Sequence, residues 1–301
     1  MKIVTYNIQY GIGLDGRFDL KRIADAVRGA DIIALQEVTR NNPQNGGRDL
    51  VSGIRELLPD YFAFFGAPYA ADMGSRIEDG RAVETWFEFG NMILSRMPIQ
   101  ATRNLLLPRR RSYGKLNLQR GALEALIDTP FGPMRFYSVH LDHTSPDERM
   151  DQIRFLMARV LSYPLEGGAL SGTEEMGMPE PPHPEAFVIL GDFNMLPGSP
   201  EYATIAGTPD HEYGLVSRIG NPVDAVTQFQ HCDIDTTTWL DPAKPQDASR
   251  HMRLDYGFVS AGIAHHITSA WVDRHAKGSD HLPLWLEFGE TGETGLSDMS
   301  G

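Results

Sequence analysis

The sequence predicts an α/β domain in which stacked β-sheets are covered by helices on the outside. Apolar strand-like runs recur along the whole chain, amphipathic helical patterns lie between some of them, and the strands dominate. The chain has 301 residues, of which 41% are hydrophobic and 22% charged, so it can bury a substantial core. No internal repeat and no clear linker divides it, and we expect residues 1–289 to form a single domain.

The expected strands are nearly continuous in apolar residues or rich in β-branched ones, as in strands covered on at least one face. In chain order they span residues 2–6, 32–36, 91–94, 123–127, 134–140, 187–190, 256–259 and 282–288. Helices are expected at residues 20–28 and 147–161, where apolar residues recur on one helical face. Ser145 is expected to cap the second helix, with Pro146 in its first turn.

Three segments are expected to be loops. Residues 166–185 are rich in Gly and Pro, which is typical of a surface loop. Residues 207–250 have few strand signals, and long structured loops often shape substrate pockets. Residues 290–301 follow the last expected strand, and we expect a flexible C-terminal tail there.

The chain begins with a strand-like run instead of a secretory signal, and no apolar run is long enough to cross a bilayer. Its single cysteine, Cys232, excludes an internal disulfide framework and a cysteine zinc cluster. We therefore expect a cytoplasmic protein without a membrane span. The sequence indicates no obligate protein partner.

The formal net charge of −13 argues against a protein that holds long nucleic acid, because such proteins are usually basic. A small anionic substrate is compatible with it, since a bound divalent metal can reverse the local potential. The segment 103–120 runs against the overall charge and is either a solvated loop or a rim that attracts anions. It contains no acid, and its basic residues are Arg103, Arg109, Arg110, Arg111, Lys115 and Arg120.

Short strings at the ends of expected strands carry polar residues suited to metal or phosphate chemistry. They are Thr5-Tyr6-Asn7, Leu35-Gln36-Glu37, Ser138-Val139-His140, Gly191-Asp192-Phe193-Asn194, Leu254-Asp255-Tyr256 and Ser279-Asp280-His281. Hydrolysis of a phosphate ester needs a cation to neutralise the phosphate oxygens and a water that is activated and aligned. The strings therefore indicate a metal-dependent phosphate-ester hydrolase whose site is assembled from strand ends.

Glu37 is the best candidate for a ligand of Mg²⁺ or Mn²⁺, because it ends an apolar strand where a buried charge needs a counter-ion. Asn7, at the end of the first strand, offers a neutral oxygen beside it. Taken alone, Glu37 could equally be a surface carboxylate that follows a strand.

Asp192 and Asn194 alternate with Phe193, so on an extended segment both side chains point to the same face. The carboxylate can accept a proton from water while the amide donates to a phosphate oxygen. The alternative is an Asx-turn at a strand end, since Asp and Asn both favour turns.

Two histidines are further candidates. His281 follows Asp280, and a neighbouring carboxylate such as Asp255 would orient it and favour its cationic form, so it could steady developing negative charge. His140, at the end of another strand, could hold a phosphate oxygen. The alternative for each is a structural hydrogen bond without a catalytic role.

Together these residues resemble the endonuclease/exonuclease/phosphatase superfamily. The match runs from Asn7 to His281 in the family's motif order, and its most specific parts are Gly-Asp-Phe-Asn at 191–194 and Ser-Asp-His-Leu-Pro-Leu at 279–284. Residues 90–96 and 120–122 give supporting matches. The resemblance implies a four-layer α/β/β/α sandwich of two mixed sheets with helices outside.

The resemblance also implies which residues serve the metal and the water. Glu37 would ligate the metal, with Asn7 and Asp280 close by. Asp192 would position or deprotonate the attacking water. Residues 1–289 would then be one catalytic domain.

For the phosphate group, the resemblance implies that Asn194 and His140 hold its oxygens. His281, oriented by Asp255, would stabilise the pentacoordinate phosphorus. Family nucleases often carry an acid where this chain has Gln9, and the abasic-site enzymes tend to have Tyr at position 140. Both departures move this chain away from the abasic-site branch.

We therefore expect an enzyme that hydrolyses a phosphodiester or phosphomonoester by in-line attack of water, using Mg²⁺ or Mn²⁺. The charge balance favours a small or soluble substrate, with Trp239, Tyr213 and Tyr256 as a candidate stacking wall. The alternative is a DNA or RNA nuclease that uses the basic segment 103–120. A lipid phosphodiesterase ranks lower, and so does a phosphate-binding module without catalysis.

Overall fold

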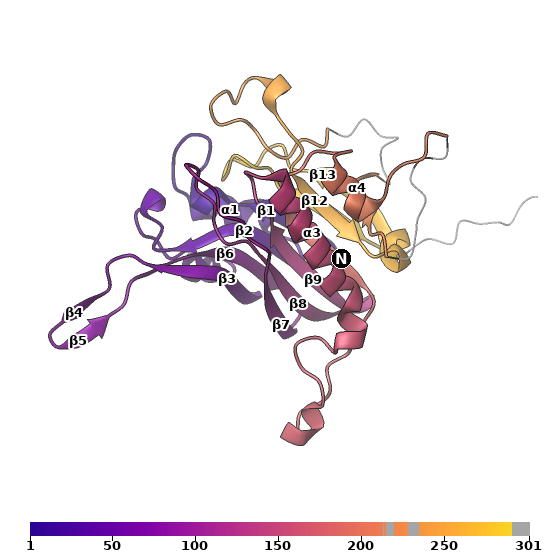
Figure 1. Cartoon of the computed structure of the whole chain (residues 1–301), viewed down its shortest axis with the longest axis horizontal. Helices are drawn as coiled ribbons and strands as arrows, with labels where there is room; N and C mark the ends of the chain where they lie inside the picture. The colour runs from indigo at the N-terminus through magenta and orange to yellow at the C-terminus, as the bar shows by residue number, and fades with distance from the viewer. Residues whose placement is uncertain (213, 215–219, 228–234, 291–301) are drawn as a thin grey trace, which may run out of the picture.

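The computed structural model describes residues 1–212, 214, 220–227 and 235–290. Two six-stranded sheets lie face to face, and a small hairpin of two strands projects from them (Figure 1). Cys232, Tyr213 and the expected tail beyond Glu290 lie outside the described residues.

The first sheet has the strand order β13-β14-β1-β2-β6-β3 and the second the order β11-β12-β10-β9-β8-β7. The strands of the first are β13 (Ile267–Val272), β14 (Leu284–Phe288), β1 (Lys2–Asn7), β2 (Ile32–Arg40), β6 (Trp86–Ser95) and β3 (Phe62–Asp72). Those of the second are β11 (Val223–Asp224), β12 (Asp255–Val259), β10 (Phe187–Asp192), β9 (Gly132–His140), β8 (Gly121–Thr129) and β7 (Ile99–Leu106). The projecting hairpin consists of β4 (Arg76–Glu78) and β5 (Arg81–Val83).

Both sheets are mixed, as expected. In the first sheet β1 pairs with β2 in parallel and with β14 in antiparallel fashion. In the second sheet β10 pairs with β9 in parallel and with β12 in antiparallel fashion. Each sheet therefore has a central strand, β1 or β10, with a parallel neighbour: β1 ends beside Gln36 of β2, and β10 ends beside His140 at the end of β9.

The main core lies between the sheets, because alternate side chains of each strand point into the same space. Fully buried residues from both sheets fill it, such as Ile3 and Ile93 from the first and Leu123 and Val188 from the second. This apolar layer holds the two sheets in a fixed relation, so polar side chains at their strand ends are held in a fixed relation too.

Helices cover both outer faces and complete the four-layer sandwich that the sequence predicts. The helices α1 (Leu20–Val27) and α2 (Leu50–Leu57) pack on the first sheet, whereas α3 (Pro146–Glu166) and α4 (Pro200–Ala206) pack on the second. Ser145 caps α3 as expected, since its hydroxyl accepts a hydrogen bond from the Glu148 amide at 3.2 Å. Short 3-10 helices lie at Gln9–Gly11, Pro43–Asn45, Thr173–Met176, Ala248–Arg250 and Ala261–His266.

The strands that the sequence analysis missed lie at sheet edges. β3, β7, β11 and β13 each end a sheet, and the side chains of β3 and β7 are mostly exposed or partly buried. A strand with one neighbour and one covered face lacks the continuous apolar run of a central strand. Within the described residues, no helix is long and apolar enough to cross a membrane.

Candidate active site

Polar side chains from both sheets meet where the central strands end. Asp192, the last residue of β10, lies between His140 of β9 and Asp255 of β12 in the strand register. From the other sheet, the Asn7 amide donates to Asp192 Oδ2 at 3.0 Å and to Glu37 Oε1 at 3.2 Å. Asn7 therefore joins residues from the two sheets into one site.

Glu37 does not end its strand, contrary to the sequence prediction. β2 continues to Arg40, with a register shift between Leu35 and Val38, and Glu37 adopts a positive φ of 60°. In a regular strand, neighbours point to opposite faces, but here both Gln36 and Glu37 reach the second sheet. Gln36 Nε2 donates to Ser138 Oγ at 2.9 Å, and Glu37 Oε1 lies 4.0 Å from His140 Nε2. The bulge therefore aims Glu37 into the site.

The segment from Asp192 to Asn194 is a turn and not the extended segment from which a shared face was inferred. The Asn194 amide donates to Asp192 Oδ1 at 2.9 Å, and Asn194 has a positive φ of 50°. The Asn194 side-chain amide donates to the Leu141 carbonyl at 3.1 Å. This Asx-turn fixes one oxygen of Asp192, so the other, Oδ2, faces Asn7 and the two histidines.

His281 is held by Asp255, as expected. Its Nδ1 lies 2.8 Å from Asp255 Oδ2, and its Nε2 lies 3.7 Å from Asp192 Oδ2. Burial alone would lower the pKa of His281, but the carboxylates of Asp255 and Asp192 outweigh it and raise that pKa to about 10. The imidazole is therefore cationic at neutral pH and presents an N–H beside Asp192.

The acids of the site carry raised pKa values. Burial, and then the charge of Asp280, raise the pKa of Glu37 to about 7. Burial raises the pKa of Asp192 to about 6, although the His281 cation acts against it. Both carboxyl groups lack enough positive charge from the protein to hold them at their ordinary values.

The donor set at Glu37 fits a hard divalent cation. Glu37 and Asp280 supply carboxylates, and Trp239 donates to Asp280 Oδ2 at 3.1 Å. Asn7, from which an oxygen ligand was expected, instead turns its NH2 group toward Glu37, and its Oδ1 accepts from the Gln9 amide at 3.1 Å. Within the described residues, no group of three or more His, Cys, Asp or Glu is arranged to hold a metal ion. A site with two carboxylates is compatible with Mg²⁺, which usually keeps several of its waters and takes one or two carboxylates from a protein.

His140 lies in the site, but its Nε2 already has a partner. Arg120 Nη1 lies 2.9 Å from it, and a guanidinium can only donate, so His140 Nε2 is the acceptor. Burial and the neighbouring Arg120 hold the pKa of His140 well below its usual range. The phosphate contact expected from His140 is therefore not available at Nε2 in this arrangement.

Arg120 is a residue that sequence reasoning did not assign to the site. It is 4% exposed and contacts a second imidazole, because its Nη2 lies 2.8 Å from His143 Nδ1. Two signals pointed to it without singling it out: its place in the basic segment and its match to the family pattern at residues 120–122.

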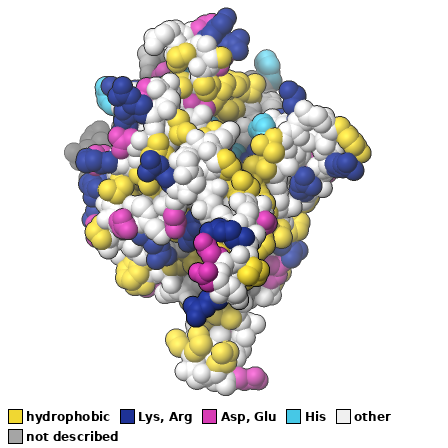
Figure 2. Space-filling view, turned by 90° about the vertical axis from the view of Figure 1, so that its left-hand side faces the viewer, with side chains coloured by type: hydrophobic (Ala, Val, Ile, Leu, Met, Phe, Trp, Pro, Cys, Tyr) yellow, Lys and Arg dark blue, Asp and Glu magenta, His cyan; other side chains and the backbone are white. Residues whose placement is uncertain are grey.

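Most of the basic segment 103–120 does not form a free anion-attracting rim. Arg103 makes two hydrogen bonds of 2.7 Å to the Glu124 carboxylate, and Arg110 pairs with Asp151. Arg109 donates to the Asn117 carbonyl. On the face shown in Figure 2, Lys and Arg side chains are interspersed with Asp and Glu instead of forming one basic stripe.

The stacking wall expected from aromatic residues is wrong for Tyr256. This residue is fully buried and stacks on Phe258 in the outer core of the second sheet. Tyr213 lies outside the described residues. Trp239 does reach the site, through Asp280, and Phe89 of β6 packs against His140 with ring centroids 5.9 Å apart.

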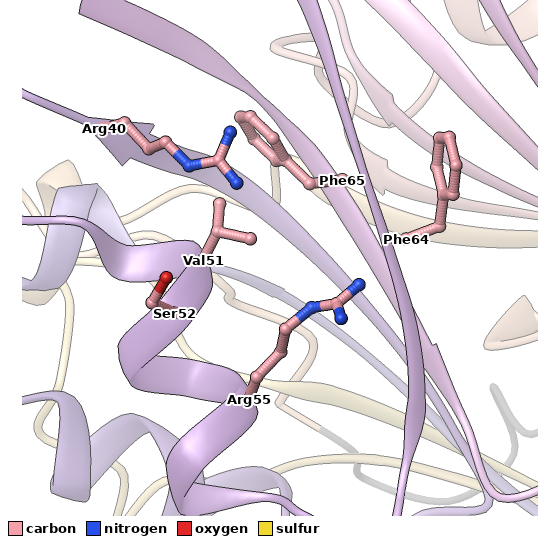
Figure 3. Close-up of a pocket in the computed structure, with 6 residues that line it drawn as sticks. All are labelled: Arg40, Val51, Ser52, Arg55, Phe64 and Phe65. Carbon is pink, nitrogen blue, oxygen red and sulfur yellow. The ribbon is translucent and has the colours of Figure 1, made fainter.

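A separate pocket on the outer side of the first sheet also contains arginines. Its volume is about 400 Å³, and it is lined by Arg40, Val51, Ser52, Arg55, Phe64 and Phe65 (Figure 3). Arg40 is neutralised there by Glu88 at 2.8 Å and by Asp49 at 3.3 Å. This surface pocket shares no residue with the strand-end site.

Comparison with known proteins gives a family match along the chain. The model of the endonuclease/exonuclease/phosphatase family matches residues 4–169 and 177–281. No protein in the curated collection matches the sequence.

Solved structures with the same fold are distant in sequence. An endonuclease/exonuclease/phosphatase from Beutenbergia cavernae is 19% identical with a TM-score of 0.63, over 96% of this chain and 72% of that one. The mannosyl-6-phosphatase Bt3783 of Bacteroides thetaiotaomicron is 17% identical with a TM-score of 0.58, over 96% and 99%. TDP2 of D. rerio, complexed with a single-strand DNA product, is 18% identical with a TM-score of 0.59, over 96% and 98%.

Proposed function

The chain belongs to the endonuclease/exonuclease/phosphatase family, and on that premise we propose that it hydrolyses a phosphate ester by in-line attack of water. The observation that carries the proposal is the Asn7 amide, which donates to both Glu37 and Asp192 and so joins a metal-binding acid to a catalytic acid. Residues 1–289 act as one catalytic domain in this proposal.

We assign the carboxylates of Glu37 and Asp280 to a bound Mg²⁺ or Mn²⁺, with Asn7 holding Glu37 in place through its NH2 group. Such a cation would neutralise negative charge on the phosphate oxygens. The bulge in β2 directs Glu37 toward the second sheet, and the Trp239 indole fixes Asp280. Without a cation, these buried acids would carry a desolvation cost that the described protein groups do not offset.

Asp192 positions the attacking water and accepts its proton. The Asx-turn holds Oδ1, while Oδ2 faces Asn7 at 3.0 Å and His281 Nε2 at 3.7 Å. With a pKa of about 6, Asp192 is ionised at neutral pH and is a stronger base than an ordinary carboxylate.

His281 stabilises the negative charge that develops at phosphorus. Asp255 orients the ring through Nδ1 and keeps it cationic, so the free Nε2–H can donate to a nonbridging oxygen. Asn194, fixed by the Asx-turn, contacts another phosphate oxygen.

The substrate is a small or soluble phosphate ester, and the protein is cytoplasmic. The net charge of −13 and the neutralised arginines of segment 103–120 support a small substrate over duplex DNA. The single cysteine supports a reducing compartment. Likeness in fold to a mannosyl-6-phosphatase is compatible with a small substrate.

A nucleic acid is the second candidate substrate. It is favoured by the exposed Arg109, Arg111, Lys115 and Tyr113 in the loop that leads to Arg120, since basic and aromatic side chains together bind single strands. The fold likeness to TDP2 in complex with single-strand DNA points the same way.

The test is hydrolysis of an aryl phosphomonoester and the matching phosphodiester, first with EDTA and then with Mg²⁺ or Mn²⁺ restored. Turnover that EDTA abolishes and metal restores supports the reaction, and the ratio of the two rates narrows the substrate class. Hydrolysis of a single-stranded oligonucleotide without hydrolysis of either aryl ester would favour the nucleic-acid substrate. Silence on all three substrates would contradict the proposal.

A further inference from the structure

Arg120 is a buried cation whose side-chain hydrogen-bond partners, among the described residues, are two neutral rings, while the carboxylates of Glu37, Asp192 and Asp142 act on it without direct contact. Its Nη1 and Nη2 lie 2.9 Å and 2.8 Å from His140 Nε2 and His143 Nδ1. Its Nε is buried and has no hydrogen-bond partner, and within the described part of the chain no carboxylate forms an ion pair with it. A buried charge without an opposite charge in contact is costly, so such an arrangement needs a reason.

Both imidazoles must accept from Arg120, because a guanidinium has donors only. His140 and His143 are therefore unprotonated at the nitrogens that face it, and neither can neutralise its charge there. They orient the planar guanidinium instead. Such a group presents its N–H donors in a fixed fork that matches the oxygens of a phosphate.

The position of His143 is itself fixed by a tight turn. Asp142 Oδ2 accepts hydrogen bonds from the amides of Thr144 at 2.8 Å and Ser145 at 2.6 Å. This turn follows β9 and leads into α3, so His143 is held at the boundary between sheet and helix. The ring is half-exposed, which places Arg120 between the buried site and solvent.

A second unpaired donor lies near Arg120. Tyr69 of β3 is opposite Phe89 of β6 in the strand register, and the Phe89 ring centroid is 6.0 Å from the Arg120 guanidinium carbon. The Tyr69 hydroxyl is buried without a hydrogen-bond partner. Burial raises the pKa of Tyr69 to about 12, so the hydroxyl keeps its proton.

We propose that Arg120 and the Tyr69 hydroxyl together bind a nonbridging oxygen of the substrate phosphate, and that His143 is the positioning residue that aims Arg120. The inference rests on the proposed function. In this proposal Arg120 makes the phosphate contact that was expected of His140, and His140 orients the guanidinium by accepting a hydrogen bond from Nη1. A phosphomonoester gains more from this pair than a diester, because its nonbridging oxygens carry more negative charge.

The test measures binding of inorganic phosphate to the full-length protein by calorimetry with Mg²⁺ present, together with KM and kcat for both aryl esters. Tyr69→Phe removes one oxygen atom and Arg120→Met removes the charge at similar length. We expect Arg120→Met to weaken phosphate binding about 10- to 100-fold and Tyr69→Phe about 3- to 10-fold, as for hydrogen bonds to a charged group. The loss in kcat/KM is expected to be larger for the monoester than for the diester.

Variants at position 143 separate positioning from packing. His143→Asn keeps an acceptor near the place of Nδ1 and is expected to bind phosphate like the wild type, whereas His143→Leu is expected to bind it more weakly with a higher KM. Arg40→Met is a matched control on the surface and is expected to bind phosphate normally.

The inference is overturned if wild-type protein binds no phosphate, or if Tyr69→Phe and Arg120→Met bind it as the wild type does. If Arg120→Met does not fold, Tyr69→Phe and the two His143 variants decide the matter. Because phosphate binding needs no turnover, the proposed phosphate contact of Arg120 and the proposed hydrolysis can be tested separately. Normal hydrolysis with unchanged phosphate binding in the variants contradicts this inference alone, and phosphate binding through Arg120 without hydrolysis contradicts the proposed function alone.

Discussion

Arg103 and Arg120 lie at the two ends of one basic segment, yet their charges have different partners. Arg103 pairs through two hydrogen bonds with Glu124 and has Glu166 at 3.4 Å. Arg120 is more deeply buried and contacts two imidazoles. Arg103 is thus paired by direct contact with a carboxylate. Arg120 has neutral partners in contact and carboxylates only at longer range, so it has N–H donors and charge left for a ligand.

The acids of the site show the same contrast with those of the surface. The carboxylates of Glu88 and Asp49 each pair with Arg40 beside the outer pocket, whereas Glu37 and Asp192 have raised pKa values. Charges of both signs are therefore left incompletely compensated at the strand ends. A phosphate ester bound together with a divalent cation would compensate both the acids and the arginine.

Among the acids and arginines compared above, the largest effect is expected for Asp192→Asn. Loss of the carboxylate removes the proposed general base, and the rate on an aryl phosphate should fall about 10²- to 10⁴-fold. Steady-state kinetics measures this, with Asp128→Asn on the exposed face of β8 as the control. If Asp192→Asn retains the wild-type rate, Asp192 has no catalytic role. Its raised pKa would then not distinguish it in function from the surface acids.

The second prediction concerns the metal. Glu37→Gln should raise the Mg²⁺ or Mn²⁺ concentration needed for half-maximal activity and weaken metal binding seen by calorimetry, because a neutral amide replaces the ligand carboxylate. Glu84→Gln changes an exposed acid in the same way and should leave both unchanged. Equal metal affinity in the two variants would remove Glu37 from the metal site.

The third prediction compares how much Arg103 and Arg120 contribute to the free energy of unfolding. Arg103→Met leaves the buried Glu124 carboxylate without its cation. The substitution should therefore lower the free energy of unfolding by about 3 kcal/mol. Arg120→Met removes a cation that has no carboxylate in direct contact, so it should lower the free energy of unfolding by less than Arg103→Met does. Urea unfolding monitored by circular dichroism measures both. A larger loss of stability for Arg120→Met would mean that Arg120 serves the fold.

The smallest effect concerns salt. With a small substrate, KM should depend weakly on ionic strength, because few phosphates are contacted. Measurement of KM across a salt series tests this. A steep rise of KM with salt on an oligonucleotide, abolished by Arg111→Gln, would favour the nuclease alternative.

Much of the fold follows from local sequence. Central strands such as β10 have continuous apolar runs, and Ser145 carries its capping signal in the residues that follow it. Edge strands such as β3 and β7 were missed because one face and one edge of each is less covered, so their composition is mixed. The short helices α2 and α4 were also missed.

The candidate site was predictable as a set of residues and less so as a geometry. The register brings Asp192 between His140 and Asp255, and the polar strand ends indicated this. The bulge at Glu37 has no signal in the residues around it, since it depends on pairing with β6. Arg120 could not be told from its basic neighbours, because its burial between two imidazoles depends on distant residues.

The most direct test of the account is the rate of metal-dependent hydrolysis by His281→Ala beside the wild type on the same aryl phosphate, with circular dichroism to establish that the variant is folded. We expect the rate to fall about 10³-fold or more, because one cationic donor to the transition state is lost. A folded His281→Ala protein with the wild-type rate would contradict the assignment of the strand-end site as the active site.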